Sequence, residues 1–220
     1  QLGDGTLVNK NTPTQIGTDN KWTSIAGGDN FSFGIKADGS LWAWGENVVG
    51  ALGDGTLNSR SVPTQIGTSS KWVSVSAGFQ NSFALKSDGT LWGWGANTGQ
   101  FLGSGNFGTQ NLPVQIGSDN KWTSVTCGEL HTLATKSDGT VWAWGRNLES
   151  QLGLGNTTDK TTPTVTSIKQ KGILSISVSR THSVAVNLDG TLWTWGQNND
   201  GQLGDGTLVS KSIPTKIGND

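Results

Sequence analysis

Short stretches in which polar and apolar residues alternate recur along the whole chain. In the N-terminal part, residues 21–25, 31–35 and 41–44 each show this alternation, which is typical of half-buried strands. An extended piece, residues 14–16, precedes them. Apolar residues nowhere recur at helical spacing over ten or more positions. The pattern predicts an all-β fold with four short strands in about 50 residues.

The Asp38-Gly39 pair lies between the last two of these strands. An Asp-Gly pair between alternating runs is a strong hairpin signal, since a type I′ turn needs positive φ at both central residues. We therefore expect a type I′ hairpin at this position.

The same pattern repeats at a fixed spacing. The five prolines lie 50, 50, 50 and 51 residues apart, and the Asp-Gly pairs, Trp-x-Trp doublets and Leu-Gly pairs keep this spacing. The chain is therefore a tandem array in one repeat domain, residues 1–220, with units at about 1–50, 51–100, 101–150 and 151–201 and a partial unit at 202–220. Residues 202–220 match residues 1–19 at 14 of 19 positions. The first half of the unit thus occurs five times and the second half four times.

A unit of this length with four strands is typical of a β-propeller blade. Alternation places Trp42 and Trp44 on one face of their strand, and Leu41 and Ala43 on the other. Because blades pack face to face, we expect both faces to be buried. The tryptophans then account for a core without any ligand.

Composition excludes several classes of function. Only 14% of the residues are charged and the net charge is −1, which argues against a nucleic-acid-binding protein. No apolar run approaches the roughly 20 residues of a membrane-spanning helix. The single cysteine, Cys127, allows no intramolecular disulfide. Since the chain has no methionine, we expect it to be a processed product or part of a longer protein.

The unit resembles the regulator of chromosome condensation 1 (RCC1) repeat. It reads Leu-Gly-x-Gly, Pro-x-x-Ile, Trp-x-x-Val/Ile-x-x-Gly and Leu/Val-Trp-x-Trp-Gly-x-Asn, and the final Asn is Asn47, Asn97, Asn147 and Asn198. The resemblance implies a β-propeller, typically of seven blades, each with four antiparallel strands. Family functions include guanine-nucleotide exchange on a nuclear GTPase and inhibition of secreted β-lactamases. In this family a histidine commonly follows the inner glycine of the blade by three residues, and here that position holds Phe31, Asn81, His131 and His182.

Four complete blades and part of a fifth leave a seven-bladed ring open. Three interpretations remain: a segment of a longer propeller closed by further repeats of the same chain, a ring completed by another chain, or an open stack with capped ends. We favour the first.

Candidate chemistry is sparse. His131 and His182 form a ligand or acid–base pair in one interpretation and hydrogen-bond the neighbouring blade in another, which we favour. Cys127 replaces small apolar residues of the other units, which predicts an inert, buried thiol. The Gly-Asp-Gly loops at Asp4, Asp54 and Asp205 lack the helix of a phosphate site and the spacing of a calcium loop, and we expect turns. We therefore predict no enzyme activity, no cofactor and no metal site.

Positions that differ between the units are free to serve a partner. One variable zone follows the inner glycine and supplies our candidate partner-binding residues: Asp29, Asn30, Phe31, Phe79, Gln80, Asn81, Glu129, Leu130, His131, Arg180, Thr181 and His182. A second zone lies in the blade connections at residues 48–49, 98–101, 148–150 and 199–200. The hypothesis is that a partner protein or glycan docks on the first zone. The alternative is drift of unconstrained loops.

Three functional interpretations remain. The favoured one is a non-catalytic binding or display module, placed by composition outside the cell or on a virion or cell surface. The alternatives are a regulator of a small GTPase that resembles an exchange factor, and a secreted enzyme-inhibitor propeller. A hydrolase lacks any Ser/His/Asp or paired-carboxylate set at a constant place in the blade.

Overall fold

The structure, a computed structural model, describes residues 1–168 and 172–218. These residues form four sheets, each of four antiparallel strands, and the all-β prediction is confirmed. The strands of blade 1 are β1 (Trp22–Gly27), β2 (Phe31–Lys36), β3 (Leu41–Gly45) and β4 (Arg60–Gln65). Those of blade 2 are β5 (Trp72–Ala77), β6 (Asn81–Lys86), β7 (Leu91–Gly95) and β8 (Gln110–Gln115). Those of blade 3 are β9 (Trp122–Cys127), β10 (His131–Lys136), β11 (Val141–Gly145) and β12 (Lys160–Val165). Those of blade 4 are β13 (Ile173–Val178), β14 (His182–Asn187), β15 (Leu192–Gly196) and β16 (Lys211–Ile217).

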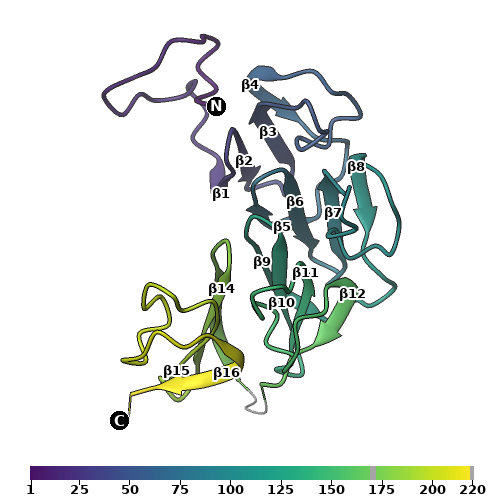
Figure 1. Cartoon of the computed structure of the whole chain (residues 1–220). Helices are drawn as coiled ribbons and strands as arrows, with labels where there is room; N and C mark the ends of the chain where they lie inside the picture. Colours follow the sequence, from purple (N-terminus) through teal and green to yellow (C-terminus); the bar gives the residue numbers. More distant parts are fainter. Residues whose placement is uncertain (169–171, 219–220) are drawn as a thin grey trace.

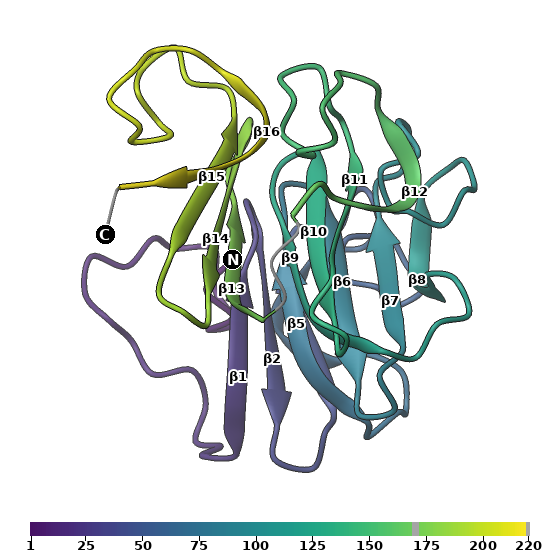
Figure 2. The same ribbon diagram turned by 90° about the horizontal axis from the view of Figure 1, so that it is seen from below.

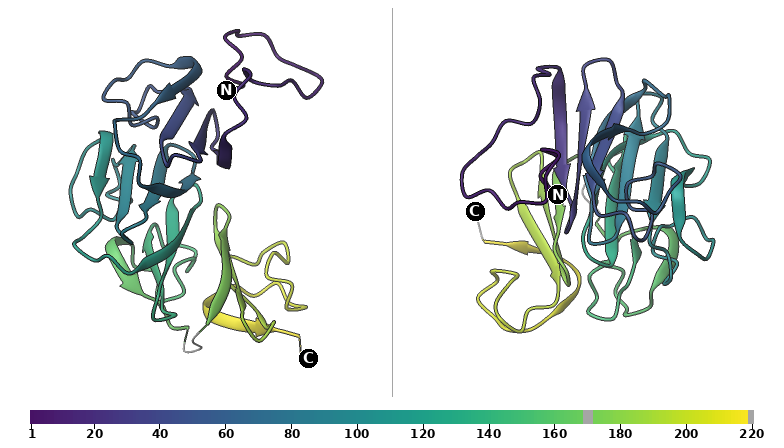
Figure 3. Two further views of the ribbon diagram at one scale, coloured as in Figure 1. Left: turned by 180° about the vertical axis from the view of Figure 1, so that it is seen from behind. Right: turned by 90° about the horizontal axis from the view of Figure 1, so that it is seen from above.

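The blades follow one another around an open arc, with blades 1 and 4 at its two ends (Figure 1). The first strands of neighbouring blades contact one another on the inner side of the arc, and in blades 2 and 3 the fourth strand lies on the outer side (Figure 2). Residues 1–21 extend from blade 1 on the side away from blade 2 (Figure 3). Within the described residues, no helix is long and apolar enough to cross a membrane.

The blades are offset from the repeat units of the sequence. The fourth strand of blade 1, β4, contains Pro63 and so comes from the next unit, and it pairs with β3. The prediction that residues 14–16 supply a strand to the blade of their own unit is therefore wrong, and no strand includes them. Residues 202–218 supply β16 and complete blade 4.

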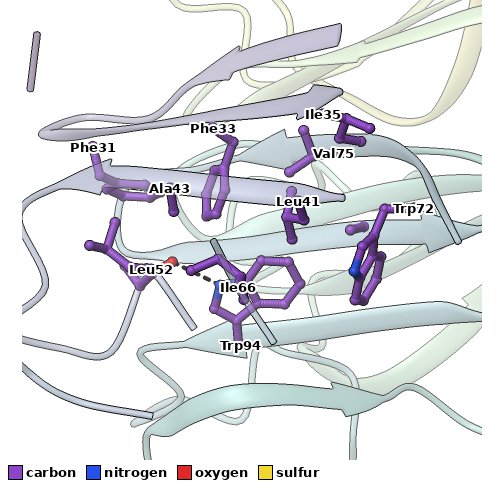
Figure 4. Close-up of a cluster of buried hydrophobic side chains, with 12 residues drawn as sticks. Phe31, Phe33, Ile35, Leu41, Ala43, Leu52, Ile66, Trp72, Val75 and Trp94 are labelled. Atoms are coloured by element: carbon purple, nitrogen blue, oxygen red, sulfur yellow. Dashed lines mark hydrogen bonds between the residues drawn. The ribbon is translucent and has the colours of Figure 1, made fainter. Parts of the chain in front are cut away.

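The core lies between blades, as the alternation predicted. Leu41 and Ala43 are fully buried on one face of β3, and Trp94 of blade 2 packs against that face from the next blade. Figure 4 shows Trp94 beside Ile66 and Leu52, with its indole Nε1 donating a hydrogen bond of 2.8 Å to the carbonyl oxygen of Ala51.

The asparagine of the Trp-Gly-x-Asn signature holds the connection between the third and fourth strands. In blade 1, the buried Asn47 donates from Nδ2 to the carbonyl oxygens of Thr56 and Asn58, and its Oδ1 accepts the N–H of Leu52. Asn147 and Asn198 make the matching bonds in blades 3 and 4. The signature asparagine thus supplies hydrogen-bond partners to backbone groups of a long loop, which would otherwise lack them.

The Asp-Gly hairpin forms, but its predicted turn type is wrong. Gly39 has a φ of 76°, whereas the non-glycine residues with positive φ in the described chain are Gln100 and Ser150. Asp38 is therefore not left-handed, as type I′ requires. The Gly39 N–H bonds the Lys36 carbonyl and the Lys36 N–H bonds the Ser40 carbonyl, the arrangement of a longer loop with its glycine in the left-handed region.

Blade 1 exposes residues whose counterparts are buried between blades. Leu2 is 45% exposed, whereas Leu52 is 0% exposed. Ile25 is 79% exposed, whereas Val75 in the same position of blade 2 is 8% exposed. The face of blade 1 that points away from blade 2 thus resembles the faces that pack against a preceding blade elsewhere in the chain.

Candidate docking surface at the loop end

The two variable zones of the sequence meet at one end of the blades. The connection from the first to the second strand carries the first zone, and the connection from the third to the fourth strand carries the second. Both lie at the same end because neighbouring strands are antiparallel. We call this the loop end. The opposite end, which holds the Asp-Gly hairpins, we call the turn end.

A hollow of about 80 Å³ lies at the loop end between blades 2 and 3. Phe79 and Gln80 of the first zone line it from blade 2, and Leu130 from blade 3. Thr98 and Phe101 of the second zone complete the lining. The structure therefore brings residues of both zones together in one place, which the sequence left separate.

A smaller hollow of about 10 Å³ lies at the corresponding place between blades 1 and 2. Phe31 and Val48 of blade 1 line it together with Phe79. Phe79 is 43% exposed and takes part in both hollows. At the loop end, this ring thus lies between the two hollows.

Burial divides the twelve candidate residues into three groups. The exposed ones are Asp29, Phe79, Gln80 and Arg180. The half-buried ones are Asn30, Glu129, Leu130, Thr181 and His182. The buried ones are Phe31, Asn81 and His131. The buried group supports the surface from beneath, whereas the other two groups are placed to touch a partner, and their role in binding stays a prediction.

His131 joins blade 3 to blade 4. Ser183 on β14 donates its hydroxyl proton to the carbonyl oxygen of Gln151, so the Nε2 of His131, 2.9 Å from the Ser183 Oγ, is the donor in their bond. Nδ1 is then the unprotonated nitrogen, and it is buried without a partner. Burial, with the nearby His182 second, lowers the pKa of His131 to about 3. The interpretation that this histidine bonds the neighbouring blade is confirmed.

Glu129 and Arg180 occupy the same position in blades 3 and 4, and the structure pairs them. The Nε of Arg180 lies 2.9 Å from Oε2 of Glu129. The two opposite charges thus cancel across the junction between the blades, and the surface there is less charged than the sequence suggests.

Cys127 is buried, as predicted. Burial raises the pKa of its thiol to about 12, and its Sγ lies 3.3 Å from Oγ of Ser76 on the neighbouring blade. A thiol with so high a pKa is not a nucleophile at neutral pH.

The Gly-Asp-Gly loops form turns. Oδ1 of Asp54 accepts the N–H and the hydroxyl of Thr56, and Oδ2 accepts two bonds from the guanidinium of Arg60. Asp4 and Asp205 bond Thr6 and Thr207 in the same way. Across the part of the chain that the structure describes, no group of three or more His, Cys, Asp or Glu residues is arranged to hold a metal ion.

Comparison with known proteins places the chain in a family. The RCC1-like domain matches residues 1–219. Human WBSCR16 has a similar structure, with a TM-score of 0.85 and 23% identity over 99% of this chain. Yeast RCC1 (Prp20), crystallised with Kap60, has a TM-score of 0.83 and 25% identity over 94% of this chain. A stretch of 53 residues, 24% of this chain, is 36% identical to the human E3 ubiquitin-protein ligase HERC2.

These proteins are longer than the chain. It spans 60% of the WBSCR16 chain, 51% of the yeast RCC1 chain and 1% of HERC2. The repeat signature, the four antiparallel blades and the family match over residues 1–219 agree, and the chain belongs to the RCC1-like domain family.

Proposed function

We propose that the chain is a non-catalytic module that binds a partner protein through its loop end. The observation that carries this proposal is the hollow between blades 2 and 3, where both variable zones supply the lining. Binding residues usually lie on loops that a rigid scaffold positions. Low charge and abundant small polar residues suit a place outside the cell or on a virion or cell surface.

The size of the hollow favours a protein over a small molecule. Pockets for small molecules usually enclose roughly 300–1,000 Å³, and the hollow holds about 80 Å³. That space accepts a single side chain of a partner. Phe79, the exposed ring between the two hollows, is the anchor that such an interface would use, because aromatic residues dominate binding energy at interfaces.

Capture of binding proteins from an extract of the source organism, with variants in parallel, tests the proposal. We expect wild-type chain to retain a partner and Phe79→Asp to lose it, since a carboxylate does not enter an apolar contact. The matched control is Val73→Asp, which places the same charge on an exposed apolar residue near the turn end. Loss with Val73→Asp but not with Phe79→Asp contradicts the proposal, and so does a wild-type chain that retains no protein. Retention of a glycan instead of a protein would replace the partner that we propose.

A second candidate is regulation of a small GTPase. The similarity to yeast RCC1 favours it, since Prp20p from Saccharomyces cerevisiae was crystallised in work on its binding to Gsp1p and histones. The test is nucleotide release from Gsp1p loaded with fluorescent GDP. Acceleration by the chain supports the second candidate, and an unchanged rate of release contradicts it.

A further inference from the structure

A lysine lies between two tryptophan rings near the turn end in each of blades 1 to 3. The register of the sheet explains the arrangement, because Trp22 on β1 pairs directly with Lys36 at the end of β2. The distances from Nζ to the two ring centroids are nearly the same in the three blades. They are 4.8 and 3.6 Å for Lys36 with Trp22 and Trp42, 4.7 and 3.7 Å for Lys86 with Trp72 and Trp92, and 4.5 and 3.6 Å for Lys136 with Trp122 and Trp142.

In blades 1 and 3 an aspartate binds this lysine, and each of its two carboxylate oxygens has its own partner. Oδ2 of Asp19 lies 2.8 Å from Nζ of Lys36, and its Oδ1 accepts the backbone N–H of Lys21 at 2.9 Å. In blade 3 the distances from Asp119 are 2.7 Å to Lys136 and 2.9 Å to the N–H of Lys121. One carboxylate thus bridges an ammonium group and a backbone N–H.

Blade 2 keeps both donors and lacks the carboxylate. Its residue at the aspartate position is Ser69. Among the residues that the structure describes, Lys86 forms no ion pair and the N–H of Lys71 has no acceptor. Asp88 does not replace the missing group, because its Oδ1 accepts the N–H and hydroxyl of Thr90, as the equivalent aspartates do in blades 1 and 3.

We propose that Nζ of Lys86 and the backbone N–H of Lys71 form a binding site for a carboxylate supplied by a ligand. The distances from Nζ of Lys86 to the rings of Trp72 and Trp92 differ by at most about 0.2 Å from the matching distances in the other two blades, so the site is organised before a ligand arrives. Burial lowers the pKa of Lys86, and the charge of the neighbouring Asp88 partly offsets this effect.

The two donors select a carboxylate over a simple anion. A carboxylate has two oxygens in one plane, and the aspartates of blades 1 and 3 use one for each donor. Chloride offers both donors the same single centre, whereas a carboxylate offers each donor its own oxygen. An acidic side chain of a partner protein and a small free carboxylate share the required chemistry.

Titration with sodium acetate, followed by NMR of the tryptophan indole N–H groups, tests the site. We expect acetate to shift the signals of Trp72 and Trp92 and to leave those of Trp122 and Trp142 in place. Sodium chloride at equal concentration is the matched control and should not produce this shift. A second titration with a short amidated peptide that contains one aspartate separates the two sources of the carboxylate.

Two variants make the test specific. Ser69→Asp supplies an internal carboxylate and should abolish the acetate-dependent shift. Asp119→Ser removes the internal carboxylate of blade 3 and should make the signals of Trp122 and Trp142 respond to acetate. The spectra themselves report whether each variant is folded. The proposal is overturned if acetate and chloride act alike, or if Ser69→Asp leaves the shift unchanged.

Discussion

The loop end and the turn end of the blades differ in how much their side chains vary from blade to blade. At the turn end, the N–H of Trp72 bonds the carbonyl oxygen of Gly39, and the hairpin packs so closely that a Cβ on Gly39 would clash with the carbonyl oxygen of Ser70. The hairpin sequence and the lysine between tryptophans recur there in blades 1 to 3.

At the loop end, main-chain groups and glycine make the corresponding contact. The N–H of Asp29 bonds the carbonyl oxygen of Gly78, and a Cβ on Gly78 would lie 2.5 Å from the carbonyl oxygen of Gly128. The side chains beside these glycines differ from blade to blade: Glu129 pairs with Arg180 between blades 3 and 4, whereas Asp29 and Phe79 hold the same position in blades 1 and 2. Because backbone and glycine make the contact that these blades share, the neighbouring side chains can differ between blades, and the proposed partner would bind this variable end.

The largest expected effect is on the core that both ends share. Trp94 is fully buried and bonds the carbonyl oxygen of Ala51. We expect Trp94→Ala to lower the free energy of unfolding by about 3–5 kcal/mol, because it leaves a cavity between blades 1 and 2. Urea denaturation measures the change. A loss below about 1 kcal/mol would contradict the view that tryptophans between blades hold the array together.

The next effect is on the pH dependence of stability, which we attribute to the buried His131 at the loop end. The ordinary pKa of histidine is 6.5, and that of folded His131 is about 3. Between these values the unfolded chain binds more protons, so the free energy of unfolding falls as the pH is lowered through this window, by at most about 1.4 kcal/mol per pH unit. We expect His131→Asn, which copies Asn81 of blade 2, to reduce this slope. Urea denaturation at several pH values measures it.

His182 supplies the control for this prediction. Its pKa is also lowered by burial, but it is only half buried. We expect His182→Asn to remove a smaller part of the slope. An identical pH dependence in wild type and His131→Asn would show that the buried histidine does not govern it.

A smaller effect is expected at the turn end. Asp119→Asn removes the charge that pairs with Lys136, and partly exposed ion pairs contribute about 0.2–1 kcal/mol. We expect a decrease of that size in the free energy of unfolding, reduced by added salt. Thermal unfolding at low and high salt measures it, and a decrease that salt does not change would contradict an electrostatic role.

The smallest effect on stability is expected at Phe79. This ring is 43% exposed, so Phe79→Ala should change the free energy of unfolding by no more than about 0.5 kcal/mol. Urea denaturation of Phe79→Ala and Trp94→Ala in parallel compares their losses in the free energy of unfolding directly. A loss similar to that of Trp94→Ala would mean that the loop end is part of the core.

Much of the fold was predictable because its signals are local and repeated. The alternation around Trp42 and Trp44 located β3 and its two faces, and Asp38-Gly39 located the hairpin. The offset between units and blades was not predictable, because β4 pairs with a strand that a long connection separates from it. The turn type was missed because the φ of Asp38 depends on how the loop closes.

The candidate site was predictable in part. Variation between units identified both zones, but only the antiparallel order of the strands shows that they share one end. The lysines at 36, 86 and 136 keep the repeat spacing and were a usable signal. Their position between tryptophans depends on pairing across two strands, which the sequence does not state.

Hydrogen exchange of the backbone in the complex with a captured partner tests the central claim most directly. We predict that the partner protects residues 28–31, 78–81, 96–101 and 129–131 at the loop end. Residues 37–40 and 87–90 at the turn end should exchange as they do in the free chain. Protection of the turn-end hairpins, with no change in the loops around Phe79, would contradict the account.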